Sequence, residues 1–218
     1  MPQTFSEENY LKAIYHIGHQ GNEKVSPTAI SEALGNNPAS VVDMLKKLTD
    51  KKLIQYDKNK GARLTDNGQK AALAIVRKHR LWETFLHDKL GYNWDEIHDI
   101  AEQLEHIRHP DLADRLEKFL DFPQFDPHGD PIPAANGKLP AKRSRPLTDI
   151  EAGMKVTITN VSDHSPAFLR YLDKHHIGIR DTVMVKEIQE FDGSILLESK
   201  GKKEVYLSAE AAKKIFAE

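Results

Sequence analysis

The stretch that organises the chain runs from residue 79 to residue 109 and reads HRLWETFLHDKLGYNWDEIHDIAEQLEHIRH. Apolar residues recur at helical spacing up to Gly91, which predicts that an amphipathic helix ends there. A second helix should follow, because Asn93 and Glu96 have the spacing of a capping box and Pro110 marks the end of the apolar pattern. The stretch therefore predicts two consecutive amphipathic helices.

Both predicted helices carry imidazole and carboxylate side chains at spacings that suit a metal ion. His79 and Glu83 stand at positions i and i+4 of the first helix. On the second helix, four such side chains fall within a stripe of about 80° to 100°: His98, Glu102, Glu105 and His106. Taken singly, each of these residues is more often solvated surface. Their repetition on both helices predicts a metal site.

Composition restricts the chemistry. The chain has 218 residues, 39% of them hydrophobic, enough for one or two ordinary domains with real cores. It has no cysteine, which excludes disulfides, thiolate nucleophiles and sulfur-rich zinc sites, so nitrogen and oxygen must hold any metal. No apolar run approaches the length of a membrane span, and the N-terminus lacks the features of a signal peptide. We expect a cytoplasmic protein with no membrane partner.

The first part of the chain has clear helix boundaries. A helix over 6–19 is expected, with Ser6 as its N-cap. Ser26-Pro27 predicts the start of a short helix that Gly35 terminates, and Asn37-Pro38 predicts the start of another helix that runs to about residue 51. Helix, tight turn and helix in this order indicate a helix-turn-helix.

Two short strands, 53–56 and 62–65, should follow around a turn at 58–61 and make the motif a winged one, after which Thr65 caps the next helix. Between residues 36 and 63, seven basic residues face three acidic ones, a local charge of 7 − 3 = +4. This charge favours phosphate, and therefore double-stranded DNA, over the alternative of a charged, solvated helical hairpin. The predicted DNA-binding residues are Pro38, Ala39, Ser40, Asp43, Lys46, Lys47, Lys58, Lys60 and Arg63.

The last part of the chain differs in character. A helix over 111–122 precedes a turn-rich segment at 125–133, in which Asp126 and His128 are further metal donors or plain turn residues, and a Pro-rich, basic linker runs to residue 146. Strand-like alternation then begins, with strands expected at 155–161, 182–189, 194–198 and 204–207 and with helices at 165–172 and from Ser208 onward. This pattern indicates a small β-barrel or sheet module of accessory function, whose His175-His176 pair is more often incidental than ligating.

In their order along the chain, these motifs resemble the diphtheria toxin repressor family, and most closely its manganese-responsive branch. The residues that carry the resemblance are the winged helix-turn-helix, Arg77-Lys-His-Arg-Leu81, His98 through His106, Asp126-Pro-His-Gly-Asp-Pro-Ile-Pro133 and the β module. The resemblance implies a mainly α chain with a C-terminal β module. Its domains would be a DNA-binding domain over 1–74, a helical metal-binding and dimerisation domain over 75–140, and an SH3-like, FeoA-type domain over 141–218. It further implies a homodimeric repressor that binds palindromic operators, controls metal homeostasis genes and uses metal as corepressor.

The resemblance also implies the ligands. The main regulatory metal would take Asn9, His79, Glu102, Glu105 and His106, and Glu102 favours manganese because the iron-responsive branch commonly has cysteine there. Asn9 departs from the family pattern, since manganese-responsive members usually have aspartate at that position. A second metal would take Glu83, Asp126 and His128, with Asp163 as a further ligand and His98 as an alternative one.

The donor set independently suits Mn²⁺, with Fe²⁺ as the alternative and Zn²⁺ or other divalent ions able to bind in vitro. Two other classes of protein remain alternatives. One is a winged-helix regulator that senses another ligand. The other is a metal-dependent hydrolase, which the sequence disfavours because it has neither an HExxH motif nor a nucleophile elbow. We therefore predict that the protein is not an enzyme.

Overall fold

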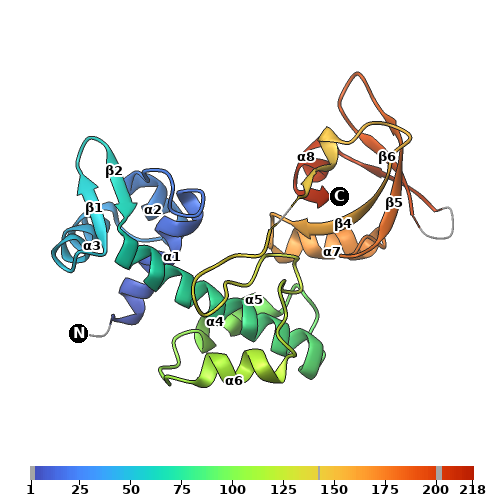
Figure 1. Cartoon of the computed structure of the whole chain (residues 1–218). Coiled ribbons are helices and arrows are strands. Elements are labelled where there is room, and N and C mark those ends of the chain that lie inside the picture. Colours follow the sequence, from blue (N-terminus) through green and yellow to red (C-terminus); the bar gives the residue numbers. More distant parts are fainter. Residues whose placement is uncertain (1–2, 142, 200–202) are drawn as a thin grey trace. The chain divides into compact units, whose positions relative to one another are not determined.

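A computed structural model of the chain describes residues 3–141, 143–199 and 203–218 (Figure 1). Lys142, in the predicted linker, lies outside them. The chain divides into two compact units. The first unit comprises Met1–His79, Leu104–Asp114 and Pro133–Lys138, and the second comprises Arg80–Gln103, Arg115–Ile132 and Leu139–Glu218.

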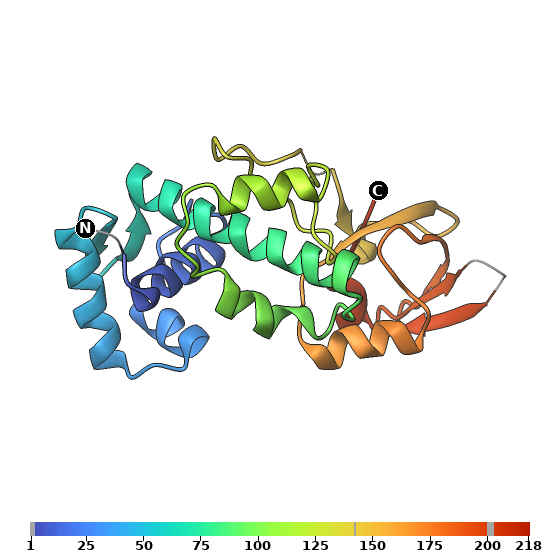
Figure 2. The ribbon, with the colours of Figure 1, turned by 90° about the horizontal axis from the view of Figure 1, so that it is seen from below.

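The first unit is built on three helices and a hairpin. The helices are α1 (Phe5–Ile17), α2 (Pro27–Leu34) and α3 (Pro38–Asp50), which pack together in Figure 2. The antiparallel strands β1 (Ile54–Asp57) and β2 (Gly61–Leu64) form the predicted wing, and the long helix α4 (Asp66–Leu90) follows them. Apolar residues from all of these elements form one buried core, among them Leu11, Ile14, Leu45, Ile54 and Ile75.

The predicted helix boundaries hold for most of this unit. Ser26 and Asn37 are the N-caps of α2 and α3, and Gly35 ends α2 in the left-handed conformation with φ 62°. The hydroxyl of Thr65 accepts a hydrogen bond from the amide of Gly68 and so caps α4. The predicted N-cap of α1 is wrong. The cap is Thr4 rather than Ser6, because Thr4 forms a reciprocal capping box with Glu7.

Position 61, at the tip of the wing, requires a glycine. Its φ is +86°, and a Cβ atom there would lie 2.5 Å from the carbonyl oxygen of Val25. Val25 pairs with the neighbouring Ala62 through two backbone hydrogen bonds of 2.8 Å. The wing is thereby attached to the segment that precedes α2.

The helical part of the second unit contains the C-terminal part of α4, most of α5 (Ile97–Leu104) and the end of α6 (Leu112–Phe119). α4 ends as predicted before Gly91, which has φ 74°. The expectation for the next helix was partly wrong: the backbone amide of Asn93 does bond Glu96, but α5 ends at Leu104. Glu105 and His106 lie in a turn beyond it, so the four predicted ligands do not form one helical stripe.

The β module of the second unit is a six-stranded antiparallel sheet with strand order β3-β8-β4-β5-β6-β7. Its helix α7 lies along one side of the sheet in Figure 1. The expected strands and helices are present, and β3 and β8 are additional ones. The elements are β3 (Arg145–Pro146), the 3-10 helix η1 (Leu147–Asp149), β4 (Lys155–Val161), α7 (Pro166–Lys174), β5 (Thr182–Ile188), β6 (Ile195–Glu198), β7 (Glu204–Leu207), α8 (Ala209–Lys213) and β8 (Ile215–Ala217).

Trp94 attaches the α4–α5 connection to this module. Its ring is part of the module's buried core, and its Nε1 donates to both carboxylate oxygens of Asp173 at 3.0 Å. Beside it, Arg170 of α7 pairs with Asp95 at 3.1 Å. Trp94 therefore packs this connection into the core of the β module.

Among the described residues, every helix is too short or too polar to cross a membrane.

Candidate metal centre and nucleic-acid interface

Glu105 is the centre of the first cluster of candidate ligands. Its side chain has no solvent exposure, and its Oε2 lies 2.7 Å from Nδ1 of His79 on α4. The ammonium group of Lys12, on α1, donates to both carboxylate oxygens at 2.7 and 2.8 Å. Burial would raise the pKa of Glu105, but the hydrogen bond from His79 and the charge of Lys12 outweigh burial and lower that pKa.

Helix α1 supplies further groups to this cluster. Oε2 of Glu8 lies 2.6 Å from Nδ1 of His106, and the ring of Phe5 stacks on the His106 ring with centroids 4.7 Å apart. Oδ1 of Asn9 is buried and accepts no hydrogen bond from the residues that the structure describes. A buried acceptor of this kind is costly unless something binds it, and a cation would do so.

The remaining predicted ligand of this set, Glu102, lies on the last turn of α5. It is half-buried and stands three residues before Glu105 in the sequence. Its Oε1 lies 3.7 Å from Nε2 of His98, four residues earlier on the same helix.

A second cluster lies wholly within the second unit. Donor atoms of Glu83, Asp126 and His128 all lie within 4.8 Å of one another, and all three residues are buried. Oδ2 of Asp126 and Nδ1 of His128 have no hydrogen-bond partner among the residues described. Their nearest charged neighbours are Arg80, with Nε 3.5 Å from Oδ2 of Asp126, and Glu83, with Oε1 3.9 Å from Nδ1 of His128. The structure therefore brings this predicted set together, with buried donor atoms that fit a cation.

Protonation in the second cluster reflects burial and neighbouring charge. Burial and the nearby carboxylates of Asp130 and Glu83 raise the pKa of Asp126. Burial alone would lower the pKa of His128, but the carboxylate of Glu83, with Oε1 3.9 Å from Nδ1, raises that pKa to about 9. The metal-free cluster thus favours an imidazolium beside a carboxylate.

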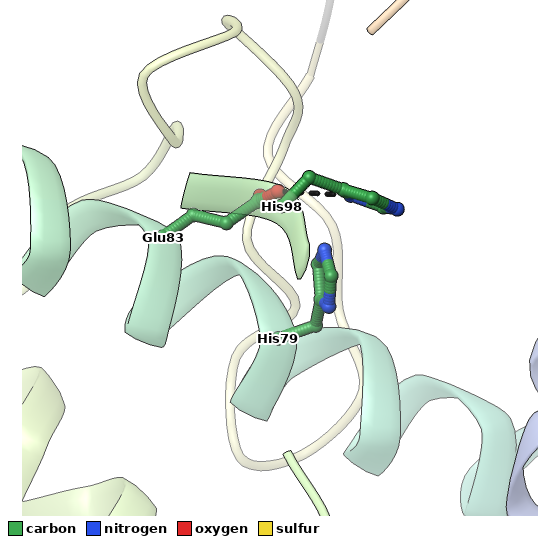
Figure 3. Close-up of side chains that lie close together, drawn as sticks. All are labelled: His79, Glu83 and His98. Carbon is green, nitrogen blue, oxygen red and sulfur yellow. Dashed lines mark hydrogen bonds and ion pairs between the residues drawn. The ribbon is translucent and has the colours of Figure 1, made fainter. Parts of the chain in front are cut away.

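Two predicted ligands lie at the margins of this cluster. Nδ1 of His98 is 3.4 Å from Oε1 of Glu83. Figure 3 draws this contact, with His79 one turn before Glu83 on α4. The structure does not bring Asp163 into the cluster: its carboxylate pairs with Lys214 at 2.9 Å and accepts from the amide of Ser165.

The predicted DNA-binding residues of α3 and the wing are all exposed. They include Ser40 and Asp43 on α3 and Lys58, Lys60 and Arg63 on the wing. Two lysines at the C-terminal end of α3 also contact α1, since Lys47 and the C-cap residue Lys51 approach Oε1 of the fully buried Glu7 at 3.0 and 2.7 Å. Glu7 therefore fixes α3 against α1.

Sequence reasoning missed Glu7, Glu8, Lys12 and His164. The spacing of Glu8 and Lys12 was a usable signal, because Lys12 follows Glu8 by one helical turn and so shares its face. His164 stacks on His128 with centroids 4.3 Å apart, and no spacing in the sequence indicated that contact.

Models of known protein families match three consecutive segments of the chain. Residues 4–62 match the iron dependent repressor N-terminal DNA binding domain, residues 65–134 its metal binding and dimerisation domain, and residues 145–218 the FeoA domain. The chain is 33% identical over 165 residues to the iron-dependent repressor IdeR of Mycobacterium leprae, covering 69% of this chain and 68% of the relative.

Two solved structures extend this likeness over nearly the full length. A manganese-dependent transcriptional repressor in complex with manganese is 38% identical, with a TM-score of 0.87 over 97% of this chain and 98% of the other. ScaR with bound Zn²⁺ is 33% identical, with a TM-score of 0.80 over 100% of this chain and 99% of the other.

Fold and site together define a metal-dependent DNA-binding regulator. The chain belongs to the iron-dependent repressor, or diphtheria toxin repressor, family. It combines a winged-helix DNA-binding domain, a helical dimerisation domain and an SH3-like FeoA domain, and it acts as a metal-dependent transcriptional repressor. Members of this family are DNA-binding repressors rather than enzymes, which rules out the alternative that the chain is a hydrolase.

Proposed function

We propose that this chain is a cytoplasmic homodimeric repressor of metal homeostasis genes that uses Mn²⁺ as corepressor and binds a palindromic operator. It works as three modules, with boundaries near residues 74 and 140. The regulatory metal takes Asn9, His79, Glu102, Glu105 and His106, and a second metal takes Glu83, Asp126 and His128, with His98 as an additional ligand.

The observation that carries this proposal is the position of α1. One face of this helix reaches candidate ligands through Glu8 and Lys12, while Glu7 reaches the recognition helix α3 through Lys47 and Lys51. Any change in how α1 is held against Glu105 and His106 is therefore transmitted to the helix that reads DNA. This coupling supports a regulator whose ligand site controls operator binding.

The donor chemistry supports manganese. A bound divalent cation supplies a positive centre to which imidazole nitrogens and carboxylate oxygens from separate segments can bind at once. The set contains no sulfur, and a carboxylate at Glu102 suits Mn²⁺ or Fe²⁺ better than a soft ion. Intrinsic affinity would still favour Zn²⁺, so geometry and cellular supply must provide the selectivity.

Operator recognition follows from the exposed face of α3. In a dimer, two copies of α3 enter successive major grooves only if they are about 34 Å apart, one turn of DNA. Side chains such as Ser40 and Asp43 would contact base edges, and Lys58 and Lys60 would hold phosphates. Asn9, as part of the metal site, would fix α1 and hence this spacing.

The decisive experiment measures operator affinity by fluorescence anisotropy at fixed salt, with a duplex selected from a random pool and with Mn²⁺ titrated from zero. We expect Mn²⁺ to tighten binding by tenfold or more, which requires only about 1.4 kcal/mol of coupling. Glu102→Ala and His106→Ala should abolish this response while leaving the folded circular dichroism spectrum unchanged.

Asp99→Ala is the matched control, because Asp99 is an exposed acid on the same helix, α5, outside the proposed ligand set. It should respond to Mn²⁺ like the wild-type chain. A normal metal response in Glu102→Ala and His106→Ala would show that the ligands are misassigned. Parallel titrations with Fe²⁺ and Zn²⁺ rank the metals, and a stronger response to Fe²⁺ at matched free concentrations would remove the manganese assignment.

A further inference from the structure

We infer that Lys12 is a built-in competitor of the regulatory metal: its ammonium group holds the carboxylate of Glu105 until a divalent cation displaces it. The inference deepens the proposed function and rests on Glu105 being a metal ligand. It assigns to Lys12 a role in setting metal affinity, which neither the sequence pattern nor the comparisons indicate.

The contacts of Glu105 are those of an occupied cation site. Both of its oxygens accept from Nζ of Lys12, at 2.7 and 2.8 Å. Nδ1 of His79 lies 2.7 Å from Oε2, and Nε2 of His106 lies 3.9 Å from Oε1. One cationic nitrogen thus holds the carboxylate that two other proposed metal ligands, His79 and His106, also approach.

The two cations compete for the same carboxylate and repel each other. The Lys12 side chain is only 12% exposed and that of Glu105 is not exposed at all, so little water screens a second positive charge there. A metal ion at Glu105 would need at least one carboxylate oxygen that Lys12 now holds. Metal binding must therefore move the ammonium group away or tolerate it as an adjacent like charge.

Lys12 also stabilises the metal-free protein. A buried carboxylate without a countercharge is strongly destabilising, and Lys12 supplies that charge when no metal is bound. The lysine therefore has two opposite effects: it stabilises the metal-free fold and it weakens metal binding. Together they raise the metal concentration at which the repressor responds.

Helix α1 carries both the competitor and a proposed ligand. Asn9 precedes Lys12 by three residues, so the two side chains lie one turn apart on the same face of α1. Oδ1 of Asn9 is the buried acceptor with no partner among the described residues. Exchange of the Lys12 contact for an Asn9 contact would keep α1 attached to the cluster while changing its register against Glu105.

The test compares Mn²⁺ affinity among full-length variants by competition with a chromophoric chelator at constant pH. All variants carry Asp126→Asn, which removes a donor of the second cluster. Lys12→Met should bind Mn²⁺ about tenfold more tightly, equivalent to about 1.4 kcal/mol. Its metal-free form should also melt at a lower temperature. Lys12→Gln, which can still donate a hydrogen bond to Glu105, provides a second uncharged variant if Lys12→Met folds poorly, and it should shift affinity in the same direction.

Two controls distinguish the loss of a positive charge at position 12 from the loss of any positive charge and from any substitution at that position. Lys24→Met removes one positive charge from an exposed site in the same unit, and Lys12→Arg keeps the charge in place. Both should bind Mn²⁺ with the affinity of the parent chain. Unchanged or weaker affinity in both Lys12→Met and Lys12→Gln, with binding lost in Glu105→Gln, would overturn the inference and leave the metal site standing. Parent-like binding in Glu105→Gln would instead overturn the metal site itself.

Discussion

At the scale of single residues, Glu7 shows how a buried charge is made stable. Burial alone would raise the pKa of its carboxyl group, but the hydrogen bonds from Lys51, from the amide of Thr4 and from Lys47 outweigh burial and lower that pKa to about 2. Its ordinary value is 4.5. The ionised form is therefore the one that holds α1 to α3.

The shifted pKa of Glu7 predicts a pH dependence of stability. A carboxyl group with a lowered folded pKa stabilises the protein above its unfolded value and loses this contribution as the pH falls towards the folded value. The free energy of unfolding should fall by up to about 3 kcal/mol between pH 5 and pH 2 because of this residue. Urea unfolding at a series of pH values measures it.

Glu7→Gln should have a smaller pH slope than the wild-type chain over this range. Glu23→Gln, which changes an exposed glutamate of the same unit, should keep the wild-type slope. An equal slope in all three proteins would show that Glu7 does not fix α1 to α3 by charge.

His128 predicts a pH dependence of metal binding. The neighbouring Glu83 raises the pKa of the His128 imidazole to about 9, and burial raises the pKa of its neighbour Asp126. Metal ligands must be deprotonated, so binding at the second cluster releases protons and strengthens as the pH rises from 6.5 to 8. Calorimetry in buffers of different ionisation enthalpy counts the protons, and Asp126→Asn should reduce the count. Proton-free binding at pH 7 would contradict this assignment.

At the scale of elements, α3 and the wing should contribute differently to DNA binding. Lys58→Ala and Lys60→Ala should weaken binding to all duplexes about equally and lower the salt slope by about one unit each. Ser40→Ala should instead change sequence preference, because its hydroxyl faces bases in the proposed complex. Lys174→Ala, at the exposed end of α7, is the control. A sequence-selective defect in the wing variants would contradict these roles.

Trp94 joins the α4–α5 connection to the β module within the second unit. Trp94→Ala should destabilise that unit by about 3 kcal/mol, because it removes a large ring from the module's core and the donor to Asp173. Trp82→Ala, which alters a half-buried tryptophan on α4 that is not part of this core, should cost less. Thermal unfolding followed by near-ultraviolet circular dichroism compares the two. An equal loss of stability in both variants would show that Trp94 does not hold the α4–α5 connection to the β module.

The elements also show what local sequence determines. The boundaries of α2, α3 and the wing were predictable because Ser26, Asn37 and Gly35 act through their own backbone neighbours. The strand β8 was not predictable, because its three residues are assigned by pairing with β4, more than fifty residues earlier in the chain. The early end of α5 was missed because the apolar pattern continues past Leu104 although the helix does not.

The residues of the candidate site were likewise predictable only in part. Glu83, Asp126 and His128 were assigned by resemblance, and the structure brings their donor atoms together. Lys12 and Glu8 were missed because their partners lie more than ninety residues away, and no local pattern predicts such pairs. Asp163, also assigned by resemblance, pairs with Lys214 instead.

At the scale of the whole molecule, the proposal links metal binding to DNA binding through α1, whose Lys12 and Glu8 contact Glu105 and His106. A ligand can shift operator affinity only by the difference in its affinity for the two conformations of the dimer. The same coupling requires that bound operator tighten metal binding by an equal factor.

The most direct measurement is the affinity of the purified, full-length protein for its selected operator before and after exhaustive chelation, at one salt concentration. Loss of metal should weaken binding at least tenfold, and re-addition of Mn²⁺ should restore it. A duplex with five extra base pairs between its half-sites should not recover, because the second half-site then faces the opposite side of the DNA. Equal affinity with and without metal would contradict the central claim that a divalent cation controls operator binding.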